Sequence, residues 1–280
     1  FIKSRSKPQT GLPKLVQGNK PWDGGNLILS TDEREFLLEK YPHIDKLIKK
    51  YIGSFEFINN KVRYCLWLKD VSPNEYRNIP EIMDRLEKVA EVRRTTKTVA
   101  VQAQAQTPML FSQIRQPEAD YILVPETSSA NRRYVPMGFM SNDVIASNST
   151  LVATNMTLYH FGVLTSNVHM AWMRTVCGRL KSDYRYSPAV YNNFPWPSPT
   201  NDQKEKIRKT AQAILNARAL YTDSNLADLY DPLTMPTELL KAHKANNRAV
   251  MHAYGFSIKM SEADCVAELM RMYQKLTKEK

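Results

Sequence analysis

The sequence predicts an α+β fold, in which a β-rich domain with inserted helices is followed by a C-terminal helical bundle. Of the 280 residues, 42% are hydrophobic, which is enough to bury a core in one large or two modest domains. Short runs of β-branched and aromatic residues, interrupted by Ser, Asn, Asp and Pro, fill the middle third and predict strands. Long amphipathic patterns with start and stop signals fill the last third and predict helices.

The first third predicts mixed structure. "STDEREFLLEKYP" begins with a Ser/Thr cap, has acids in its first turn and ends at Pro42, which predicts a short helix. "FEFINNKVRYCLWLK" alternates on either side of Asn59 and Asn60, which tolerate left-handed backbone angles, and so predicts a β-hairpin. "PEIMDRLEKVAEVRR" has apolar residues at helical spacing and predicts a second helix. Residues 95–107 have weak periodicity and predict a mobile connection.

The middle third predicts an antiparallel sheet, because its apolar runs are short and separated by turn residues. These runs are "YILVPE", "RRYVPMGFM", "VIAS", "STLVAT" and "LYHFGVL". Thr165 and Ser166 then predict the cap of a helix that runs to about Lys181. Trp172 and Leu180 would lie on one apolar face of this helix, because they are separated by two steps of four residues.

The last third predicts three helices. "NDQKEKIRKTAQAILNARALY" carries one apolar stripe, "MPTELLKAHKANNRAVMHAYG" has Pro near its start and Gly at its end, and "SEADCVAELMRMYQKLTKEK" starts with a Ser-x-x-Asp box. Because each helix has an apolar face to bury, we expect a small bundle or docking against the sheet domain. We therefore divide the chain into residues 1–200 and a C-terminal helical domain, residues 201–280.

The composition predicts a cytoplasmic protein with no membrane partner. No apolar run approaches the roughly 18 to 20 residues of a membrane span, and the first residues, "FIKSRSKPQT", lack the apolar core of a signal peptide. The three cysteines are far apart and set among apolar neighbours, which predicts reduced, buried thiols. Because the chain begins with Phe1, we expect that the front of a longer polypeptide is missing.

The sequence lacks the common catalytic and cofactor motifs G-x-G-x-x-G, Walker A, H-E-x-x-H and C-x-x-C. A hydrolase could pair Cys177 with His169 or His160 and with Asp183, but His169 and Cys177 would lie two helical turns apart, which favours a structural thiol. A zinc site from the same histidines and cysteine lacks a close ligand pair. "NNFPW" has the wrong residue order for the Asn-Pro-Pro-aromatic tetrapeptide of amino-group methyltransferases. We therefore predict no catalytic, cofactor-binding or metal-binding residues in this chain.

Residues 177–197, "CGRLKSDYRYSPAVYNNFPWP", combine basic, aromatic and amide side chains with a single acid. Two interpretations are open, a nucleic-acid surface and a structural junction. Arginine and lysine neutralise phosphates, tyrosine hydroxyls bond phosphate oxygens, and asparagine amides can pair with a base edge or the DNA backbone. Tyr191, Phe194 and Trp196 fit a core that docks the segment better than they fit a contact surface.

Several long segments carry a family resemblance, among them "GNKPWDGGNLILS", "NEYRNIPEIMDRLEKVAEVRR", "IRQPEADYILVPETSSANRRYVPMGF", "TLYHFGVLTSNVHMAWMRTVCGRLKSDYRYSPAVYNNFPWP" and "LADLYDPLTMPTELLKAHKANNRAV". The resemblance runs over about residues 18–255, nearly the whole chain. The sequence resembles the C-terminal target recognition domain and helical tail of the MmeI-type (type IIG/IIL) enzymes. These are class I S-adenosylmethionine-dependent DNA methyltransferases of restriction-modification systems.

The resemblance implies a sequence-specific duplex DNA recognition module of an adenine-specific DNA methyltransferase in a bacterial restriction-modification system. Residues 1–200 would be the β-rich target recognition domain, and residues 1–25 would link it to an upstream methyltransferase domain. Double-stranded DNA and that upstream domain would be the partners. S-adenosylmethionine would bind upstream, with no cofactor in this fragment. The fragment would not be catalytic alone; the whole protein would methylate adenine N6, and whether it also cleaves DNA is left open.

We expect the base-reading residues in the β-rich middle and at the start of the predicted helix, because arginine suits guanine and asparagine suits adenine. The adjacent arginines at 132 and 133 fit phosphate binding at a hairpin tip equally well. The rival function is a protein–protein interaction or oligomerisation domain without catalysis, with the aromatic segment as its interface. The base-reading candidates are Arg132, Arg133, Ser166, Asn167 and His169. The DNA-backbone candidates are Arg174, Arg179, Lys181, Tyr184, Arg185, Tyr186, Asn192 and Asn193.

Overall fold

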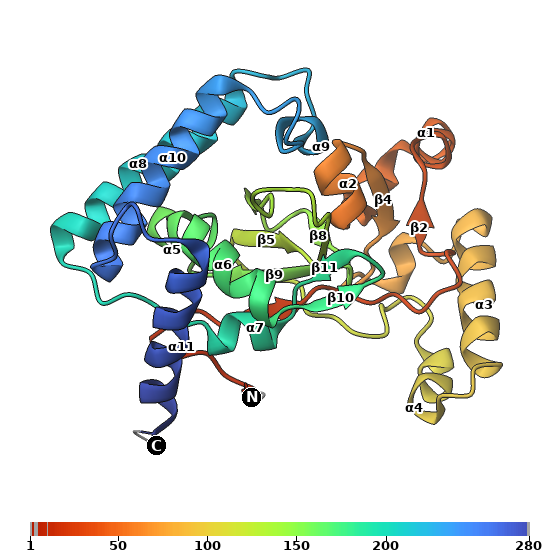
Figure 1. Cartoon of the computed structure of the whole chain (residues 1–280). Coiled ribbons are helices and arrows are strands. Elements are labelled where there is room, and N and C mark those ends of the chain that lie inside the picture. Colours follow the sequence, from red (N-terminus) through yellow and green to blue (C-terminus); the bar gives the residue numbers. More distant parts are fainter. Residues whose placement is uncertain (1, 3–4, 10, 279–280) are drawn as a thin grey trace. The chain divides into compact units, whose positions relative to one another are not determined.

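The computed structural model describes residues 2, 5–9 and 11–278 (Figure 1). The chain forms two compact units. The larger unit comprises residues 1–16, 120–140 and 151–280, and the smaller unit comprises residues 17–119 and 141–150. Both contain helices and strands, which confirms the predicted α+β class.

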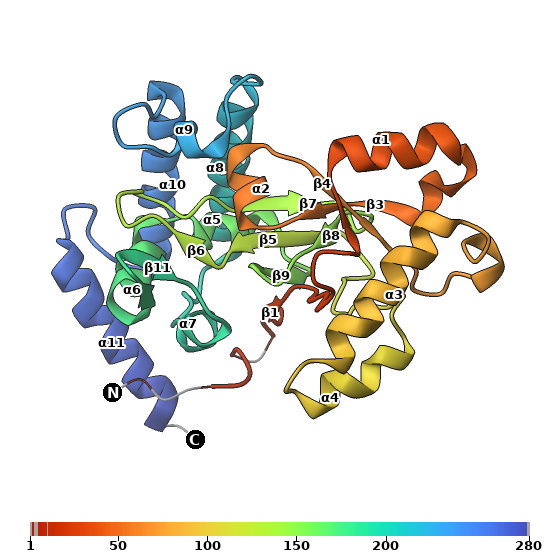
Figure 2. The same ribbon diagram turned by 90° about the vertical axis from the view of Figure 1, so that its right-hand side faces the viewer.

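The smaller unit is built on a four-stranded sheet in the order β2-β4-β3-β8, in which β3 and β8 are parallel and the other pairs antiparallel (Figure 2). Leu37, Ile44, Cys65 and Leu86 belong to the apolar core that the helices form with this sheet. The strands are β2 (Ile28–Leu29), β3 (Ile48–Ile52), β4 (Arg63–Leu66) and β8 (Ile145–Ala146). The helices are α1 (Thr31–Lys40), η1 (Pro42–Leu47), α2 (Ser54–Asn59), η2 (Pro73–Glu75), α3 (Pro80–Arg94), α4 (Val99–Gln102) and η3 (Ala103–Gln106).

Two helices of the smaller unit, α1 and α3, were predicted from the sequence and are confirmed. Helix α1 begins after Ser30, whose Oγ accepts a hydrogen bond from the Glu33 amide at 3.1 Å, while the Glu33 carboxylate accepts one from the Ser30 amide at 2.8 Å. This reciprocal capping box satisfies two amides that the first helical turn leaves without acceptors. Helix α3 buries Ile82 and Val89 at the predicted spacing.

The predicted hairpin around Asn59 and Asn60 is wrong in its first half. Residues 54–59 form helix α2, and only the residues after the asparagines form a strand, β4. The Glu56 carboxylate accepts a hydrogen bond from the Gly53 amide at 2.9 Å and so caps the helix. Asn60 does adopt the left-handed conformation, with φ 50° and ψ 44°, but there it ends a helix.

Most of the predicted mobile connection, residues 95–107, is helical, with α4 and η3 covering residues 99–106. Their backbone is held by Arg93, the last-turn residue of α3, whose side chain is fully buried. Every guanidinium N–H of Arg93 has a main-chain acceptor, because its nitrogens donate five hydrogen bonds of 2.7–3.1 Å. The acceptors are the carbonyls of Pro21, Trp22, Gln104, Thr107 and Leu110.

We predict that Arg93→Met lowers the free energy of unfolding by about 3 kcal/mol, because five main-chain carbonyls lose the donors that the buried guanidinium supplies. Urea denaturation at neutral pH measures the change. Arg94→Met is the matched control, since Arg94 is exposed and pairs with Glu87 on the surface of the same helix. We expect the control to stay within about 0.5 kcal/mol of the parent. Equal losses in the two variants would contradict the structural role of Arg93.

The larger unit contains a four-stranded sheet in the order β1-β9-β5-β7 (Figure 2) and a three-stranded sheet in the order β10-β11-β6. Its core combines strand residues such as Ile122 and Leu151 with helix residues such as Trp172 and Ile207. The strands are β1 (Val16–Gln17), β5 (Tyr121–Pro125), β6 (Thr127–Ser128), β7 (Gly138–Met140), β9 (Thr150–Thr154), β10 (Gly178–Leu180) and β11 (Asp183–Arg185). The helices are α5 (Leu158–Leu164), α6 (Asn167–Val176), α7 (Pro188–Asn193), α8 (Asn201–Ala219), α9 (Leu226–Leu229), α10 (Thr237–Tyr254) and α11 (Glu262–Lys278).

The structure corrects two predictions in the middle of the chain. "LYHFGVL" is helix α5, since a short apolar run fits a buried helix as well as a strand. The helix capped by Ser166 ends at Val176, and the residues after it form the β10–β11 hairpin. Leu180, predicted on the apolar helix face, is therefore a strand residue, and its side chain is 52% exposed.

The three predicted C-terminal helices are present as α8, α10 and α11, and α8 and α10 run side by side (Figure 1). Helix α8 packs closely on α5 at Gly162, where an added Cβ would lie 2.6 Å from Ile207. The Asn246 amide donates to the Gly162 carbonyl at 2.7 Å, and its oxygen accepts from Thr210 at 2.9 Å. These helices thus share a core with the strands, while the domain boundary expected at residue 200 stays a prediction.

The described part of the predicted N-terminal linker, residues 1–25, is anchored where it belongs to the larger unit. Gln9 donates to the Phe194 carbonyl at 2.9 Å, and the Tyr191 hydroxyl donates to the Pro13 carbonyl at 2.8 Å.

All three cysteines of the chain are free thiols, as predicted, and only Cys177 is half-buried instead of buried. Among the described residues, no helix combines the length and the apolar character that crossing a membrane requires.

Candidate nucleic-acid interface

The β10–β11 hairpin carries the exposed cations of residues 177–197. Its antiparallel register pairs Arg179 with Tyr184 and Leu180 with Asp183, which leaves Lys181 and Ser182 as a two-residue turn. Strand β11 also pairs with β6, so the hairpin is anchored to a third strand. Its exposed side chains include Arg179 on one side of the hairpin, Leu180 and Arg185 on the other, and Lys181 in the turn. Together we call these four the basic hairpin face.

Arg179 is exposed yet fixed in position. Its guanidinium lies over the ring of Tyr184, 3.8 Å from the ring centroid, and its Nη1 donates to the Ser182 carbonyl at 2.8 Å. Tyr184 itself is buried, so it provides a rigid platform for the arginine. Lys181 makes no hydrogen bond or ion pair with the described residues, and its φ of 56° is left-handed, which is rare for a non-glycine residue.

Arg185 is a third exposed cation of the hairpin and lies on the side opposite to Arg179. Its guanidinium lies 3.4 Å from the carboxylate of Glu126, and its side chain is 57% exposed. An ion pair that is this exposed contributes little to stability and leaves the arginine able to exchange partners. The basic hairpin face therefore presents accessible cations, as an electrostatic contact surface for phosphates requires.

Only one of the three predicted arginines outside the hairpin is freely exposed. Arg133 is exposed, whereas the Arg174 guanidinium pairs with Glu262 at 2.9 Å and donates to the Arg133 carbonyl at 3.1 Å. Arg132 is half-buried, and this burial lowers its pKa, against the opposing effect of the Asp183 and Asp231 carboxylates. Arg174 thus ties α6 to α11, and Arg133 is left as the accessible candidate.

Ser166, His169 and Tyr186 are buried, so the structure holds these predicted DNA contacts inside the protein. The Ser166 hydroxyl accepts from the His169 amide at 3.3 Å and donates to the Val163 carbonyl at 2.7 Å. The His169 ring and the Tyr186 hydroxyl are hydrogen-bonded at 2.9 Å. The N-terminus of α6, with its Ser166 cap, is buried, so these groups face the core. A capping sequence predicts where a helix begins but not whether that end is buried.

The predicted asparagine contacts are also engaged within the protein. Asn167 is half-buried, and its backbone amide donates to Asn247 at 2.9 Å. Asn192 and Asn193 are buried, and their amides donate to main-chain carbonyls at 2.8 Å. Tyr191, Phe194 and Trp196 are buried as well, which confirms that the aromatic part of the segment is core.

The cysteine hydrolase arrangement is not formed by the described residues. The Cys177 thiol donates to the Arg185 carbonyl at 2.7 Å, and burial raises the pKa of this thiol to about 11. Burial also lowers the pKa of His169 to about 3 and that of His160 to about 4. The thiol is thus held protonated without a histidine base, and this opposes nucleophilic attack.

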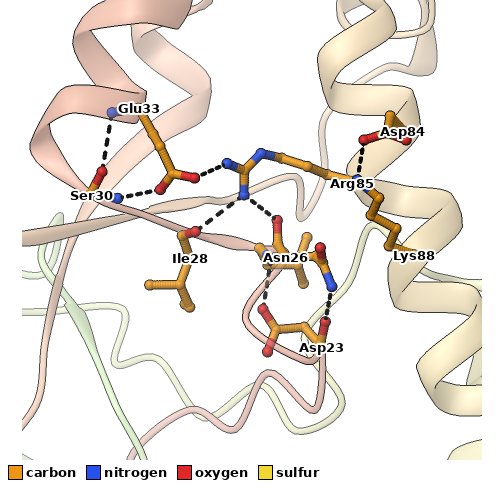
Figure 3. Close-up of polar contacts among 9 residues, drawn as sticks. Asp23, Asn26, Ile28, Ser30, Glu33, Asp84, Arg85 and Lys88 are labelled. Carbon is orange, nitrogen blue, oxygen red and sulfur yellow. Dashed lines mark hydrogen bonds and ion pairs between the residues drawn. The ribbon is translucent and has the colours of Figure 1, made fainter.

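The smaller unit has a hollow of about 570 Å³ lined by α1, α3 and the turn that precedes β2 (Figure 3). Arg85 crosses it, donating to the Asn26 and Ile28 carbonyls at 3.1 and 3.3 Å and pairing with Glu33. The pKa of Glu33 is lowered, mainly by its hydrogen bond from the Ser30 amide. Because Glu33 is held ionised and Arg85 is bonded to it and to two carbonyls, this pair ties α1 to α3 and is not an acid–base pair.

Comparison with known proteins places these features in a family. The sequence matches the MmeI target recognition domain over residues 1–198 and the MmeI C-terminal domain over residues 199–279. The chain belongs to this MmeI family. DNA methyltransferase A of Bacillus subtilis (strain 168) is 38% identical over 278 residues, which are 99% of this chain and 32% of that protein.

A solved structure of the type IIL restriction-modification enzyme MmeI in complex with DNA is also similar. It is 43% identical, with a TM-score of 0.97, and the match covers 99% of this chain and 37% of that chain. The chain thus spans about a third of these MmeI-family relatives. The comparison confirms the resemblance drawn from the sequence segments.

Leu180 is an exposed residue of the hairpin, contrary to the prediction. Its sequence pattern indicated the apolar face of a helix, because the step of four residues from Trp172 continues through Val176. Gly178 and the polar Lys181, Ser182 and Asp183 are the signal against that helix, since glycine and turn residues interrupt the pattern.

We predict that buried His169 makes the MmeI-family fold acid-sensitive. Its pKa is about 3 in the folded protein and about 6.5 in an unfolded chain, so the unfolded state binds the extra proton between these values. The contribution of neutral His169 to the free energy of unfolding is fully present above about pH 6.5 and is lost as the pH falls toward 3. His169→Gln should therefore reduce the slope of unfolding free energy against pH by up to about 1.4 kcal/mol per unit.

Urea denaturation at several pH values between 7 and 4 measures this slope. His252→Gln is the control, because His252 lies exposed in the last turn of α10. The buried His243 remains in both variants, so neither slope falls to zero. Identical slopes for His169→Gln and the parent would show that His169 is not the proton acceptor.

Proposed function

We propose that this chain recognises a specific sequence in duplex DNA as the target recognition module of an adenine methyltransferase in a restriction-modification system. The observation that carries the proposal is the likeness, at 43% identity over 99% of the chain, to MmeI in a structure that contains DNA. The module carries no catalysis of its own, and the whole protein transfers a methyl group to adenine N6.

The accessible cations of the larger unit support a role in DNA contact. Arg179, Lys181 and Arg185 neutralise phosphates and release counterions, which gives affinity without sequence preference. Arg133 is the exposed candidate for reading a guanine, because its fork of donors matches the guanine acceptors. The buried candidates contribute indirectly, since they position α6 and the hairpin.

S-adenosylmethionine is assigned to an upstream methyltransferase domain, because the residues of this chain do not fit it. A cofactor loop needs closely spaced glycines that let the backbone approach the ligand. Gly24 and Gly25 form a left-handed turn, but an added Cβ on Gly24 would lie 2.8 Å from Val92, and Gly25 has open space around it. The glycines thus serve the turn and its packing against α3.

Selection of bound duplexes from a random-sequence library tests the proposal. We expect enrichment of one short motif that contains an adenine. Binding without enrichment would reduce the chain to an electrostatic clamp. Absence of binding, together with self-association that is insensitive to salt, would favour the interaction-domain alternative.

We predict that Arg179→Ala combined with Arg185→Ala weakens binding about equally for all duplexes, because phosphate contacts carry no sequence information. The slope of log affinity against log salt should fall by about two. Fluorescence anisotropy titrations at four salt concentrations measure both quantities.

The control combines Arg94→Ala with Arg271→Ala, which removes the same charge from arginines paired with Glu87 and Glu268. We expect the control to keep its affinity and its salt slope. If the control and the hairpin variant lose equal affinity, the effect comes from net charge alone, and the basic hairpin face is not a contact surface.

A further inference from the structure

The loop of residues 129–137 joins β6 to β7 and contains no helix or strand. It carries Arg133, whose exposed side chain makes no hydrogen bond or ion pair with the described residues. The loop opens with a turn, in which the Arg132 amide donates to the Ser129 carbonyl at 3.2 Å. Beyond this turn, side chains of other elements hold the loop, as a segment without a strand ladder requires. The direction of Arg133 therefore depends on those side chains.

Tyr134 follows Arg133 and is anchored on α10. Its buried ring stacks on His243, with 4.0 Å between the ring centroids and 15° between the ring planes. Its hydroxyl accepts a hydrogen bond from Nδ2 of Asn247 at 2.8 Å. His243 and Asn247 are neighbours on one face of α10, because they are four residues apart. Together they hold both the ring and the hydroxyl of Tyr134.

The same asparagine is tied to α6. Its Oδ1 accepts a hydrogen bond from the backbone amide of Asn167 at 2.9 Å. Asn167 is the first residue of α6, and an amide at this position has no acceptor within its own helix. Asn247 thus uses both ends of its side-chain amide to join the loop and α6 to α10. A leucine has the same branching as an asparagine but can make neither hydrogen bond.

A second attachment acts on the backbone of Arg133 itself. The Arg174 guanidinium of α6 donates to the Arg133 carbonyl at 3.1 Å and pairs with Glu262 of α11 at 2.9 Å. The loop is therefore fixed at two adjacent residues, while the Arg133 side chain stays exposed. An arginine reads guanine through two parallel hydrogen bonds, which require a defined direction of approach.

We infer that Asn247 is a positioning residue for DNA recognition, because its hydrogen bond to Tyr134 sets the direction in which Arg133 approaches a base pair. The inference rests on the proposed function and extends it to α10, which does not itself have to touch DNA. A contact group that is held in place before binding loses little conformational entropy and keeps its direction. Loosening the loop therefore costs discrimination at one base pair, while phosphate contacts elsewhere persist.

The test begins with Arg133→Ala, which identifies the base pair that Arg133 reads as the position of the selected duplex at which the preference falls. Asn247→Leu should reduce the preference at the same position by roughly tenfold, the order of discrimination that one bidentate contact provides. At other positions its preferences should stay within about twofold of the parent, and its salt slope should be unchanged. Equilibrium titrations of the full 280-residue chain with duplexes that differ by one base pair measure these preferences.

Two further variants test the route through Tyr134. Asn247→Asp should keep the preference, because a carboxylate accepts hydrogen bonds from both the Tyr134 hydroxyl and the Asn167 amide. Tyr134→Phe breaks the same bond from the loop side and should reproduce the loss at the Arg133 position. Adding Asn247→Leu to Tyr134→Phe should then reduce the preference no further, whereas losses that add would show that Asn247 acts by another route.

Asn246→Ala is the structural control. Asn246 is the adjacent residue of α10, but its hydrogen bonds run to Gly162 of α5 and Thr210 of α8 and not to the loop. We expect this variant to unfold at a lower urea concentration than the parent and to keep the parent's preference at every position. A loss of preference in Asn246→Ala equal to that in Asn247→Leu would assign the effect to general destabilisation.

A preference at the Arg133 position that Asn247→Leu leaves intact, or a loss spread equally over all positions, would overturn the positioning role. An Arg133→Ala variant with the parent's preferences at every position would overturn it as well. In each of these cases motif-dependent binding by the parent still upholds the proposed function. Duplex binding by the parent without any preference, or no binding, would instead overturn both.

Discussion

The arrangement of the candidate interface depends on the buried hydrogen bond between His169 and Tyr186. It joins the first turn of α6 to the residue that follows β11, and two more hydrogen bonds link α6 and the residue after it to β11 and α7. Trp172 donates to the Val190 carbonyl at 3.0 Å, and the Cys177 thiol donates to the Arg185 carbonyl. Helix α6 therefore holds both the hairpin and α7, and a neutral imidazole with its tyrosine partner completes this attachment.

Local sequence signals predicted the structure wherever the local pattern decides it. The Ser30 cap and the Gly255 stop mark real helix ends, because capping depends on a few adjacent residues. "LYHFGVL" and Leu180 were misassigned because the burial of a short apolar run depends on distant partners. Arg93 is a polar example of the same dependence, since three of its five carbonyl acceptors lie outside residues 95–107.

The candidate site was predictable at the level of a segment and less so at the level of single residues. The basic and aromatic composition of residues 177–197 located the hairpin, and Arg179, Lys181 and Arg185 are exposed there. Ser166, His169 and Tyr186 have the same chemical capacity but point into the protein. A sequence lists donors and acceptors, whereas their direction depends on the packing of α6 against its neighbours.

The anchoring of the N-terminal segment has a consequence for how such a module diversifies. Tyr191 and Asn192 hold this segment by donating to the main-chain carbonyls of Pro13 and Arg5. Every amino acid has such a carbonyl, so these hydrogen bonds require no particular side chains in the N-terminal segment. The exposed surface of the hairpin can then accumulate substitutions while the attachment beneath it stays the same.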